Sequence, residues 1–257
     1  MHTETIYRIE ELFPLLTPRS FCLFRGLSNA KYHLTTSLAR NGGNERAILR
    51  NFAKYAALED TSIWKQMVIG QHHGLPTRLL DWSHSPLVAL YFAISEKNPE
   101  DIHAHDCILW QIDVDEVNSL LPRKYMTMLK EDGEDTKFFT LRKLNSKNVE
   151  MRDIDDNQAV LLLEPPAIDM RIINQFSFFS VIPNTVEMEV FLTHTDRTVE
   201  YIIDKSIRSE IQDMLDGLNI SERTMLTDLD GMCTQLSRFY RTHWSRRSFY
   251  SDKDSKV

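Results

Sequence analysis

The sequence predicts a single α+β domain with a mixed central sheet and with its helices concentrated in the N-terminal half. Apolar residues recur at helical spacing early in the chain, whereas short apolar or alternating segments typical of strands dominate the middle and late parts. The 257 residues contain no internal repeat. Hydrophobic residues make up 42% of the chain, close to the norm for a globular domain with a sizeable core.

The N-terminal half combines helices with short strands. Asn44 can cap one helix, Asp60 or Thr61 the next, and Ser85 a third that has Pro86 at its first position. Helices are predicted at 6–16, 36–39, 45–58, 61–72 and 86–97, and strands at 21–24 and 78–82.

The C-terminal half is expected to supply most of the strands. Residues 123–157 are charged and weakly periodic, which predicts a mobile insertion or lid. The domain then spans 1–240, and 241–257 form a polar, partly basic tail that is either a solvated end or a functional patch. Strands are predicted at 107–114, 159–163, 178–182, 187–192 and 201–203, helical turns at 168–176, and helices at 206–215 and 231–240.

Composition excludes several classes of protein. The net charge of −7 argues against broad nonspecific nucleic-acid binding, which needs clustered cations. No apolar run approaches the roughly 20 residues of a membrane span, and the N-terminus lacks the features of a secretory signal. Cys22, Cys107 and Cys233 are odd in number and far apart, so we expect a reducing cytoplasm and no metal site.

The segment from Gln71 to Ser83 carries the densest polar cluster in the chain. It places histidines, an arginine, an aspartate and a tryptophan around a break at Gly74 and Pro76, directly before an apolar run. Polar groups between two apolar elements must satisfy one another in a buried network or face a ligand. Both interpretations remain open.

Arg25 and Gly26 follow a predicted buried strand. An arginine there is costly unless its guanidinium is paired, so it either grips a phosphate or carboxylate or forms an internal ion pair, for example with Asp81. The glycine allows close approach of a ligand to the backbone.

Several other residues are candidates for chemistry or binding. His72 and His73 end a helix; they point about 100° apart, so only a bend lets both serve one site, and either is a candidate acid or base. Arg78 and Asp81 could form an ion pair across a turn; otherwise Arg78 is a candidate for cofactor binding and Asp81 a candidate catalytic residue. Candidates for binding or packing are Gln71, Trp82, Ser83, Tyr91 and Gln175.

Glu187 and Glu189 form the last candidate site. On the strand predicted at 187–192, their carboxylates share one face. Such a pair could stabilise an oxocarbenium ion in glycosidic cleavage, although alternating acids on an exposed strand often face only solvent.

Four blocks of this sequence resemble the FRG domain, which is named for the tripeptide Phe24-Arg25-Gly26. The run from Gln71 to Ser83, with the apolar segment 86–93, is similar to its long and specific central signature. Residues 171–179 and 226–231 resemble later blocks, so the resemblance covers roughly 20–240. Ser177 and Thr227 depart from the glycine and proline usual in the family. The resemblance implies a bacterial or viral setting, with a role in antiviral defence or a toxin system.

The order of these elements is also similar to that of ADP-ribosyltransferase-like enzymes. In that architecture a first-strand arginine holds the NAD phosphates, a second strand shapes the nicotinamide pocket, and a late acid stabilises the ribosyl cation. Here Arg25, Ser83 and either Gln175 or Glu187 with Glu189 would take these roles. This comparison rests on fold-level analogy.

These observations predict a cytoplasmic effector directed at NAD or another nucleotide, with NAD as the expected cofactor. The expected ligand is a nucleotide-type small molecule or a macromolecular target, and no membrane. One alternative is a noncatalytic sensor that meets a protein partner through 123–157 or the tail. Another is a nucleic-acid-directed hydrolase that uses His73 and Asp81. The oligomeric state is left open.

Overall fold

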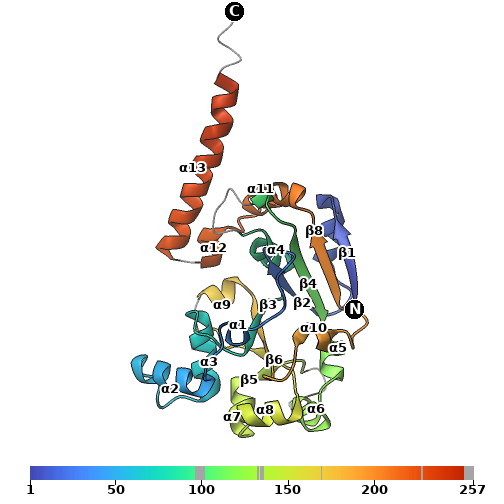
Figure 1. Ribbon diagram of the computed structural model, residues 1–257, viewed down its shortest axis with the longest axis vertical. Coiled ribbons are helices and arrows are strands. Elements are labelled where there is room, and N and C mark those ends of the chain that lie inside the picture. Colours follow the sequence, from blue (N-terminus) through green and yellow to red (C-terminus); the bar gives the residue numbers. More distant parts are fainter. Residues whose placement is uncertain (96–101, 132, 134–135, 169, 227, 252–257) are drawn as a thin grey trace, which may run out of the picture.

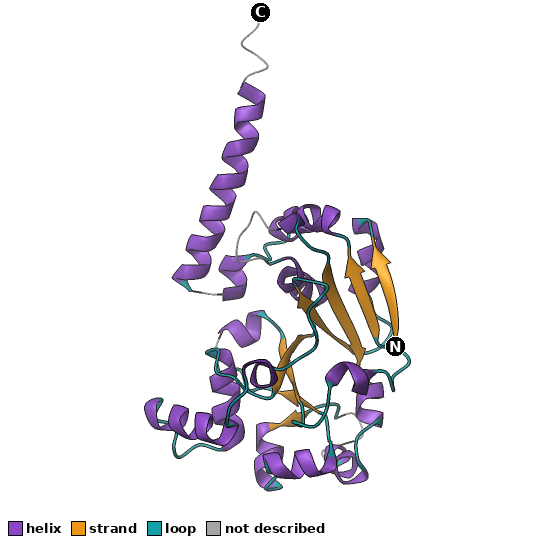
Figure 2. Cartoon of the chain, in the orientation of Figure 1, coloured by secondary structure: helices purple, strands orange, loops and turns teal. Residues whose placement is uncertain are grey.

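The computed structural model describes residues 1–95, 102–131, 133, 136–168, 170–226 and 228–251, with side chains described as far as Tyr240 in the last range. These residues form one mixed sheet of eight strands with helices packed around it (Figures 1 and 2), which confirms the single α+β domain. The strands are β1 (His2–Ile6), β2 (Cys22–Leu27), β3 (Leu79–Ser83), β4 (Cys107–Asp113), β5 (Phe139–Thr140), β6 (Leu161–Glu164), β7 (Ser177–Val181) and β8 (Val199–Ile203).

The two central strands of the sheet, β2 and β3, are joined by very little backbone pairing. Its strand order is β1-β8-β4-β2-β3-β7-β6-β5, with β1/β8 and β5/β6 parallel and the other neighbours antiparallel. β2 pairs with β4 along its whole length, but it pairs with β3 only at Phe24 and Ser83. The sheet therefore consists of a β1-β8-β4-β2 half and a β3-β7-β6-β5 half that meet at one point.

Helices occur in both halves of the chain, so the expected concentration in the N-terminal half is wrong. They are α1 (Ser37–Asn41), α2 (Glu45–Tyr55), α3 (Ile63–His72), α4 (Pro86–Ile94), α5 (Val114–Ser119), α6 (Arg123–Lys130), α7 (Leu141–Ser146), α8 (Met151–Asn157), α9 (Met170–Asn174), α10 (Met188–Leu192), α11 (Arg208–Gly217), α12 (Glu222–Leu226) and α13 (Leu229–Ser251), with the 3₁₀ helices η1 (Ile9–Leu16) and η3 (Lys205–Ile207).

The predicted helix caps are largely confirmed. The Asn44 side chain accepts a hydrogen bond from the backbone N–H of Ala47 at 3.1 Å, and Ser85 caps α4 with Pro86 at its first position. α3 is capped by Ser62 and not by Asp60 or Thr61, which precede it. Local side-chain chemistry thus sets where these helices begin.

Residues 123–157, which the sequence predicts to be a mobile insertion or lid, contain regular secondary structure in their described part. Their described part folds into α6, β5, α7 and α8 and buries Tyr125, Leu144 and Ile154 completely. Each helix here is at most eight residues long. The helical spacing of apolar residues is interrupted between these short helices, so no long stretch of the sequence shows a helical period.

Three apolar clusters make up the core. One lies between α4, α11, η1 and the β1-β8-β4-β2 half, and one between α2, α3, α6–α8 and the other half. The third includes Leu23 of β2, Trp82 of β3 and Leu162 of β6, and so crosses from one half to the other. The point where the halves meet is therefore packed on one face of the sheet.

The last helix, α13, extends away from the rest of the molecule (Figure 1). Its range includes part of the predicted 241–257 tail, but the side chains of 241–251 and residues 252–257 lie outside what is described. Among the described helices, none combines the length and the apolar character of a membrane span.

Of the three cysteines, we expect only Cys233 to react in the native protein. Cys22 and Cys107 are buried, whereas Cys233 is exposed. Desolvation raises the pKa of the Cys22 thiol, with a smaller rise from Asp113, so this group stays protonated above the pH at which a free cysteine ionises. Titration with a thiol reagent at pH 8 should give one equivalent in the folded protein and three in denaturant. Rapid labelling of all three in the native state would contradict this.

Candidate functional site

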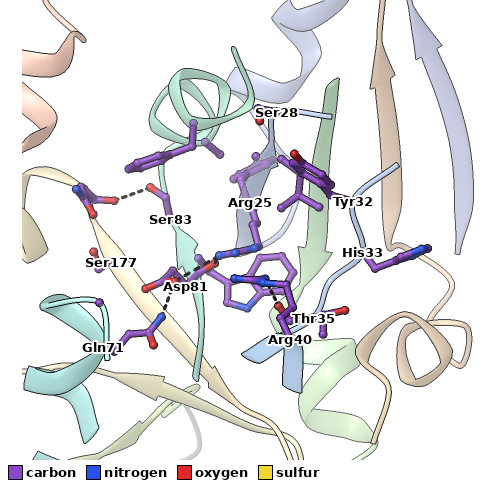
Figure 3. Close-up of a pocket in the computed structure, with 18 of the residues that line it drawn as sticks. Arg25, Ser28, Tyr32, His33, Thr35, Arg40, Gln71, Asp81, Ser83 and Ser177 are labelled. Carbon is purple, nitrogen blue, oxygen red and sulfur yellow. Dashed lines mark hydrogen bonds and ion pairs between the residues drawn. The ribbon is translucent and has the colours of Figure 1, made fainter. Parts of the chain in front are cut away.

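A cavity of about 830 Å³ opens beside the point where the two halves of the sheet meet (Figure 3). Its walls come from β2, β3, β7, α1, α4, α9, the end of α3 and the loop between β2 and α1. Four basic side chains line it: Arg25, Lys31, Arg40 and Arg171. Among the described lining residues, Asp81 is the one carboxylate, so the cavity is cationic in a chain whose net charge is −7.

Arg25 bridges the gap between the separating strands. Its Nη1 donates a hydrogen bond of 2.6 Å to the backbone oxygen of Asp81 and lies 3.5 Å from the Asp81 carboxylate (Figure 3). The Asp81 carboxylate is half exposed, whereas Arg25 keeps only 17% of its side-chain exposure. The two residues therefore meet at the wall of an open cavity and not inside the core.

Asp81 is oriented by a chain of polar contacts from α3 and the turn after it. Gln71 Nε2 donates to Asp81 Oδ2 at 2.8 Å, and Gln71 Oε1 accepts from the Thr77 hydroxyl at 2.6 Å. The backbone N–H of Thr77 in turn donates to Ser37 Oγ at 3.1 Å. Gly74, at φ 81°, allows the chain to turn back so that Gln71 and Asp81 face each other.

The Arg25 guanidinium retains unused hydrogen-bonding capacity. Among the described residues its Nε has no hydrogen-bond partner. Desolvation lowers the pKa of Arg25; the charge of Asp81 opposes this shift, and the nearby charge of Arg40 adds to it. Arg40 is exposed and donates to the Thr35 carbonyl at 2.5 Å (Figure 3). Two guanidinium groups thus lie close together, and among the described lining residues Asp81 is the one counter-charge, an arrangement that favours an anion.

The comparisons with known proteins identify the segment that contains most of these residues. A family model described as FRG domain matches residues 20–102. This chain contains an FRG domain. No curated protein and no solved structure matches the chain. The matched range includes Arg25, Arg40, Gln71 and Asp81, whereas Arg171, which also lines the cavity, lies outside it.

Gly26 of the FRG tripeptide has a packing role that the sequence did not predict. A Cβ atom at this position would lie 2.0 Å from the backbone oxygen of Ala89 and 2.4 Å from the backbone nitrogen of Ala93. Both atoms belong to α4, which packs directly across β2. Gly26 also lines the cavity, but it is the contact with α4 that requires a glycine at this position.

Only one of the two adjacent histidines of the FRG domain is among the residues that line the cavity. His72 lines the cavity, whereas His73 is exposed and is not among the lining residues. Their rings contact each other at 5.1 Å between centroids. His73 and Asp81 are therefore not brought together, and the pair expected for a nucleic-acid-directed hydrolase is absent from the described cavity. Among the described residues no cluster of His, Cys, Asp or Glu could hold a metal ion.

The aromatic candidates are only partly correct. Trp82 lines the cavity but is almost fully buried, and its indole nitrogen donates to Ser180 Oγ at 3.0 Å. Tyr91 lies in a different cavity, between α4 and α11–α13; desolvation, with a smaller contribution from Glu222, raises its pKa to about 12. Tyr32 and Phe92, which were not among the predicted site residues, also line the site with exposed rings.

Ser83 and Gln175 are tied into the structure around the cavity. Ser83 Oγ donates to the Gln175 carbonyl at 2.7 Å and accepts from the backbone N–H of Ser85. The Gln175 side chain donates to the Met225 carbonyl at 2.8 Å and so connects α9 to α12. Both residues line the cavity, with these hydrogen bonds holding β3 against the end of α9.

The strand predicted at 187–192 is wrong, and with it the paired carboxylates. Residues 188–192 form helix α10, which buries Met188 and Leu192 one turn apart. Glu187 is an exposed residue at its start, and neither glutamate lines the cavity. Glu189 instead accepts hydrogen bonds from the backbone N–H of Leu34 at 2.7 Å and contacts His33 at 3.1 Å, which anchors the cavity's β2–α1 loop.

Arg78 is a structural residue, so its predicted roles in cofactor binding and in an ion pair with Asp81 are wrong. It is 3% exposed and bonds Glu45 and Asp155 at 2.7 and 2.8 Å. Arg78 directly precedes β3 and is not among the residues that line the cavity. Desolvation lowers the pKa of Arg78, but the hydrogen bonds and charges of the two carboxylates outweigh this and raise it overall.

Proposed function

We propose that this FRG-domain protein binds NAD or a closely related nucleotide in the cavity and acts on it as an effector enzyme. The observation that supports this most is the pair of guanidinium groups, Arg25 and Arg40, in a cavity of about 830 Å³ with Asp81 as its described carboxylate. A diphosphate matches two adjacent guanidinium forks. The volume lies in the range that accommodates a cofactor-sized ligand.

In this proposal the flat rings of the ligand lie against Tyr32 and Phe92. These two side chains are 57% and 36% exposed and line the cavity on the β2–α1 loop and on α4. An exposed aromatic ring beside cationic groups offers a surface on which a nucleotide base can stack. Soluble domains otherwise tend to bury such rings.

The proposed chemistry is cleavage of the bond between ribose C1′ and the nicotinamide nitrogen. Nicotinamide leaves with the bonding electron pair as a neutral molecule, and the ribosyl carbon becomes an oxocarbenium ion that the Asp81 carboxylate stabilises. Water, or a nucleophile on a macromolecule, then bonds to C1′ and releases one proton. Asp81 replaces Glu187 and Glu189 in the acidic role because it is the carboxylate on the cavity wall.

Binding is tested with purified protein and NAD, ADP-ribose and ADP in calorimetry. We expect Arg40→Ala to weaken binding by roughly 10–100-fold, because a hydrogen bond to a charged group contributes about 1.5–3 kcal/mol. Arg40 is exposed, so its removal should leave the fold intact. Arg50→Ala, which removes an exposed arginine from α2, is the matched control and should bind as wild type does. Equal affinity of the Arg40 and Arg50 variants would contradict the proposal.

Turnover is tested separately from binding. Asp81→Asn keeps the shape of the side chain, so it should retain NAD binding while losing NAD consumption. Wild-type protein that leaves NAD untouched, with and without cell extract, argues against an enzyme. Placement of the activity in bacterial antiviral defence or a toxin system is part of the proposal and predicts that expression depletes NAD and slows growth, and that Asp81→Asn does neither.

A noncatalytic sensor is the second candidate. It is favoured by the observation that Gln71, Thr77, Ser83 and Gln175 form hydrogen bonds with one another or with neighbouring backbone around the cavity. A sensor predicts that Asp81→Asn alters only ligand affinity or stability. It also predicts that truncation after Tyr240 abolishes function.

A further inference from the structure

Helix α2 presents a row of three cations to solvent. Arg46, Arg50 and Lys54 recur every four residues, and all three are exposed. With 3.6 residues per turn they fall within a sector of about 80° and extend over about 12 Å of the helix. Leu49 and Ala53 of the same helix are buried, so α2 packs on the domain by another face. We call the three cations the basic ridge.

The basic ridge repels itself. Like charges four residues apart destabilise a helix, and the ridge contains two such pairs in succession. Among the residues that the structure describes, none forms an ion pair with the ridge, and the acidic residue of α2, Glu45, is buried against Arg78 instead. Helix α8 shows the ordinary arrangement, since its Arg152 lies 3.5 Å from Asp156 one turn later. The ridge therefore lowers the stability of α2, and a bound polyanion would remove that repulsion.

The ridge continues a basic segment that begins at the larger cavity. Lys31 and Arg40, which line that cavity, are exposed as well, so every exposed charged residue between 28 and 56 is basic. This concentration stands out in a chain whose net charge is −7. Helix α2 packs on α3 (Figure 1), and the last residues of α3, Gln71 and His72, also line the cavity. Positive charge thus extends from the cavity onto α2.

An exposed aromatic ring lies at the end of the ridge. Tyr55, the last residue of α2, is 85% exposed, and the Lys54 Nζ lies 5.9 Å from the centroid of its ring. Cations in a row beside an exposed ring are typical of surfaces that bind single-stranded nucleic acid, where phosphates contact the cations and a base stacks on the ring. A duplex has its bases stacked on one another, so the ring favours a single strand.

We propose that the basic ridge and Tyr55 bind a single-stranded nucleic acid, with its phosphates on the three cations and one base on the ring. The acidic net charge opposes binding elsewhere on the molecule and confines it to this surface. The proposal does not depend on the nucleotide site, because no residue of the ridge lines the larger cavity. Loss of NAD binding would leave it unaffected, and a ridge that binds no strand would leave the nucleotide proposal unaffected.

Binding is measured by fluorescence anisotropy, over a range of salt concentrations, with a labelled oligonucleotide of about 20 nucleotides as single-stranded DNA, single-stranded RNA and duplex DNA. We expect wild-type protein to bind a single strand more tightly than the duplex, and the tighter of the two single strands identifies the sugar that is preferred. Neutralising the ridge should weaken binding at least roughly tenfold and reduce the slope of log K against log salt by about 2, since each phosphate contact to a single strand contributes about 0.7. The variant is Arg46→Ala with Arg50→Ala and Lys54→Ala. Its matched control removes three exposed cations elsewhere, Arg19→Ala with Arg123→Ala and Lys130→Ala, and should bind as wild type does.

Two single variants separate binding from folding. Arg50→Glu replaces two repulsive pairs on α2 by attractive ones, so it should raise Tm while weakening binding more than Arg50→Ala does, and unfolding cannot produce that combination. Tyr55→Ala should weaken binding by roughly 5–100-fold, the contribution of one stacked base, and leave the salt slope unchanged. Wild-type protein that binds neither single strand, a duplex bound as tightly as a single strand, or a ridge variant with wild-type affinity and salt slope would each overturn the proposal.

Discussion

Replacing Arg78 with methionine should lower the free energy of unfolding by about 3–5 kcal/mol, the cost of removing one partner from a buried ion pair. Arg78 is 3% exposed, and its guanidinium is held by Glu45 from α2 and Asp155 from α8. Without it, Glu45, itself 6% exposed, retains a carboxylate with no cation beside it in the core. Urea denaturation measures the effect.

Two further variants separate charge from packing at this site. Arg152→Ala removes an arginine that pairs with Asp156 on the surface, where both side chains are mostly exposed, and should change stability by no more than about 0.5 kcal/mol. The double variant Arg78→Met with Glu45→Met should recover part of the loss, since it leaves fewer uncompensated charges. An Arg78→Met protein as stable as Arg152→Ala would show that the cluster is not needed.

Replacing Gly26 with alanine should cost at least about 3 kcal/mol, the upper part of the range for overpacking a core. The added methyl group would overlap backbone atoms of Ala89 and Ala93, and backbone cannot move aside as a side-chain end can. α4 would have to lift off β2. In a domain of this size each kcal/mol lowers Tm by about 2–4 °C, so Tm should fall by about 6–12 °C.

Gly217→Ala is the matched control for Gly26→Ala. Gly217 is the last residue of α11, and nothing lies within 4 Å of the position its Cβ would take. Alanine there should be neutral or should stabilise the protein by up to about 1 kcal/mol, because it lowers the entropy of the unfolded chain. Calorimetry of both variants decides the matter; equal Tm values would mean that α4 does not pack as described.

The sequence predicted those parts of the fold that depend on local chemistry. Asn44 and Ser85 mark the starts of helices, because a capping side chain bonds a backbone N–H only three residues further along the chain. α10 was assigned to a strand because Glu187 and Glu189 alternate with apolar residues, although Met188 and Leu192 also fit a helix turn. β1 was missed because it is a polar edge strand whose only buried residue is Ile6. In both cases tertiary contacts decide between patterns that the sequence permits.

The same division applies to the candidate site. Arg25 and the segment around Asp81 were singled out by their polar character next to apolar elements, and the structure brings them together. The sequence alone could not show whether Asp81 pairs with Arg25 inside the core or faces it across a pocket. In the structure the two side chains are in contact, and both line the cavity. Arg40, Tyr32 and Phe92 were not among the predicted site residues, because the sequence does not show which cavity a given basic or aromatic side chain will reach. Arg78 was misassigned because its partners, Glu45 and Asp155, are distant in sequence.

The single pairing between β2 and β3, at Phe24 and Ser83, leaves one backbone link between the two halves of the sheet. Arg25 belongs to the half that contains β2, and Asp81 belongs to the half that contains β3. On the cavity side, the hydrogen bond from Arg25 to Asp81 connects the two halves. A ligand that binds residues of both halves at once adds a second connection between them. By linkage it stabilises the joined state more as its free concentration rises above its dissociation constant, so backbone amides of β2 and β3 should exchange hydrogen more slowly when the cavity is filled.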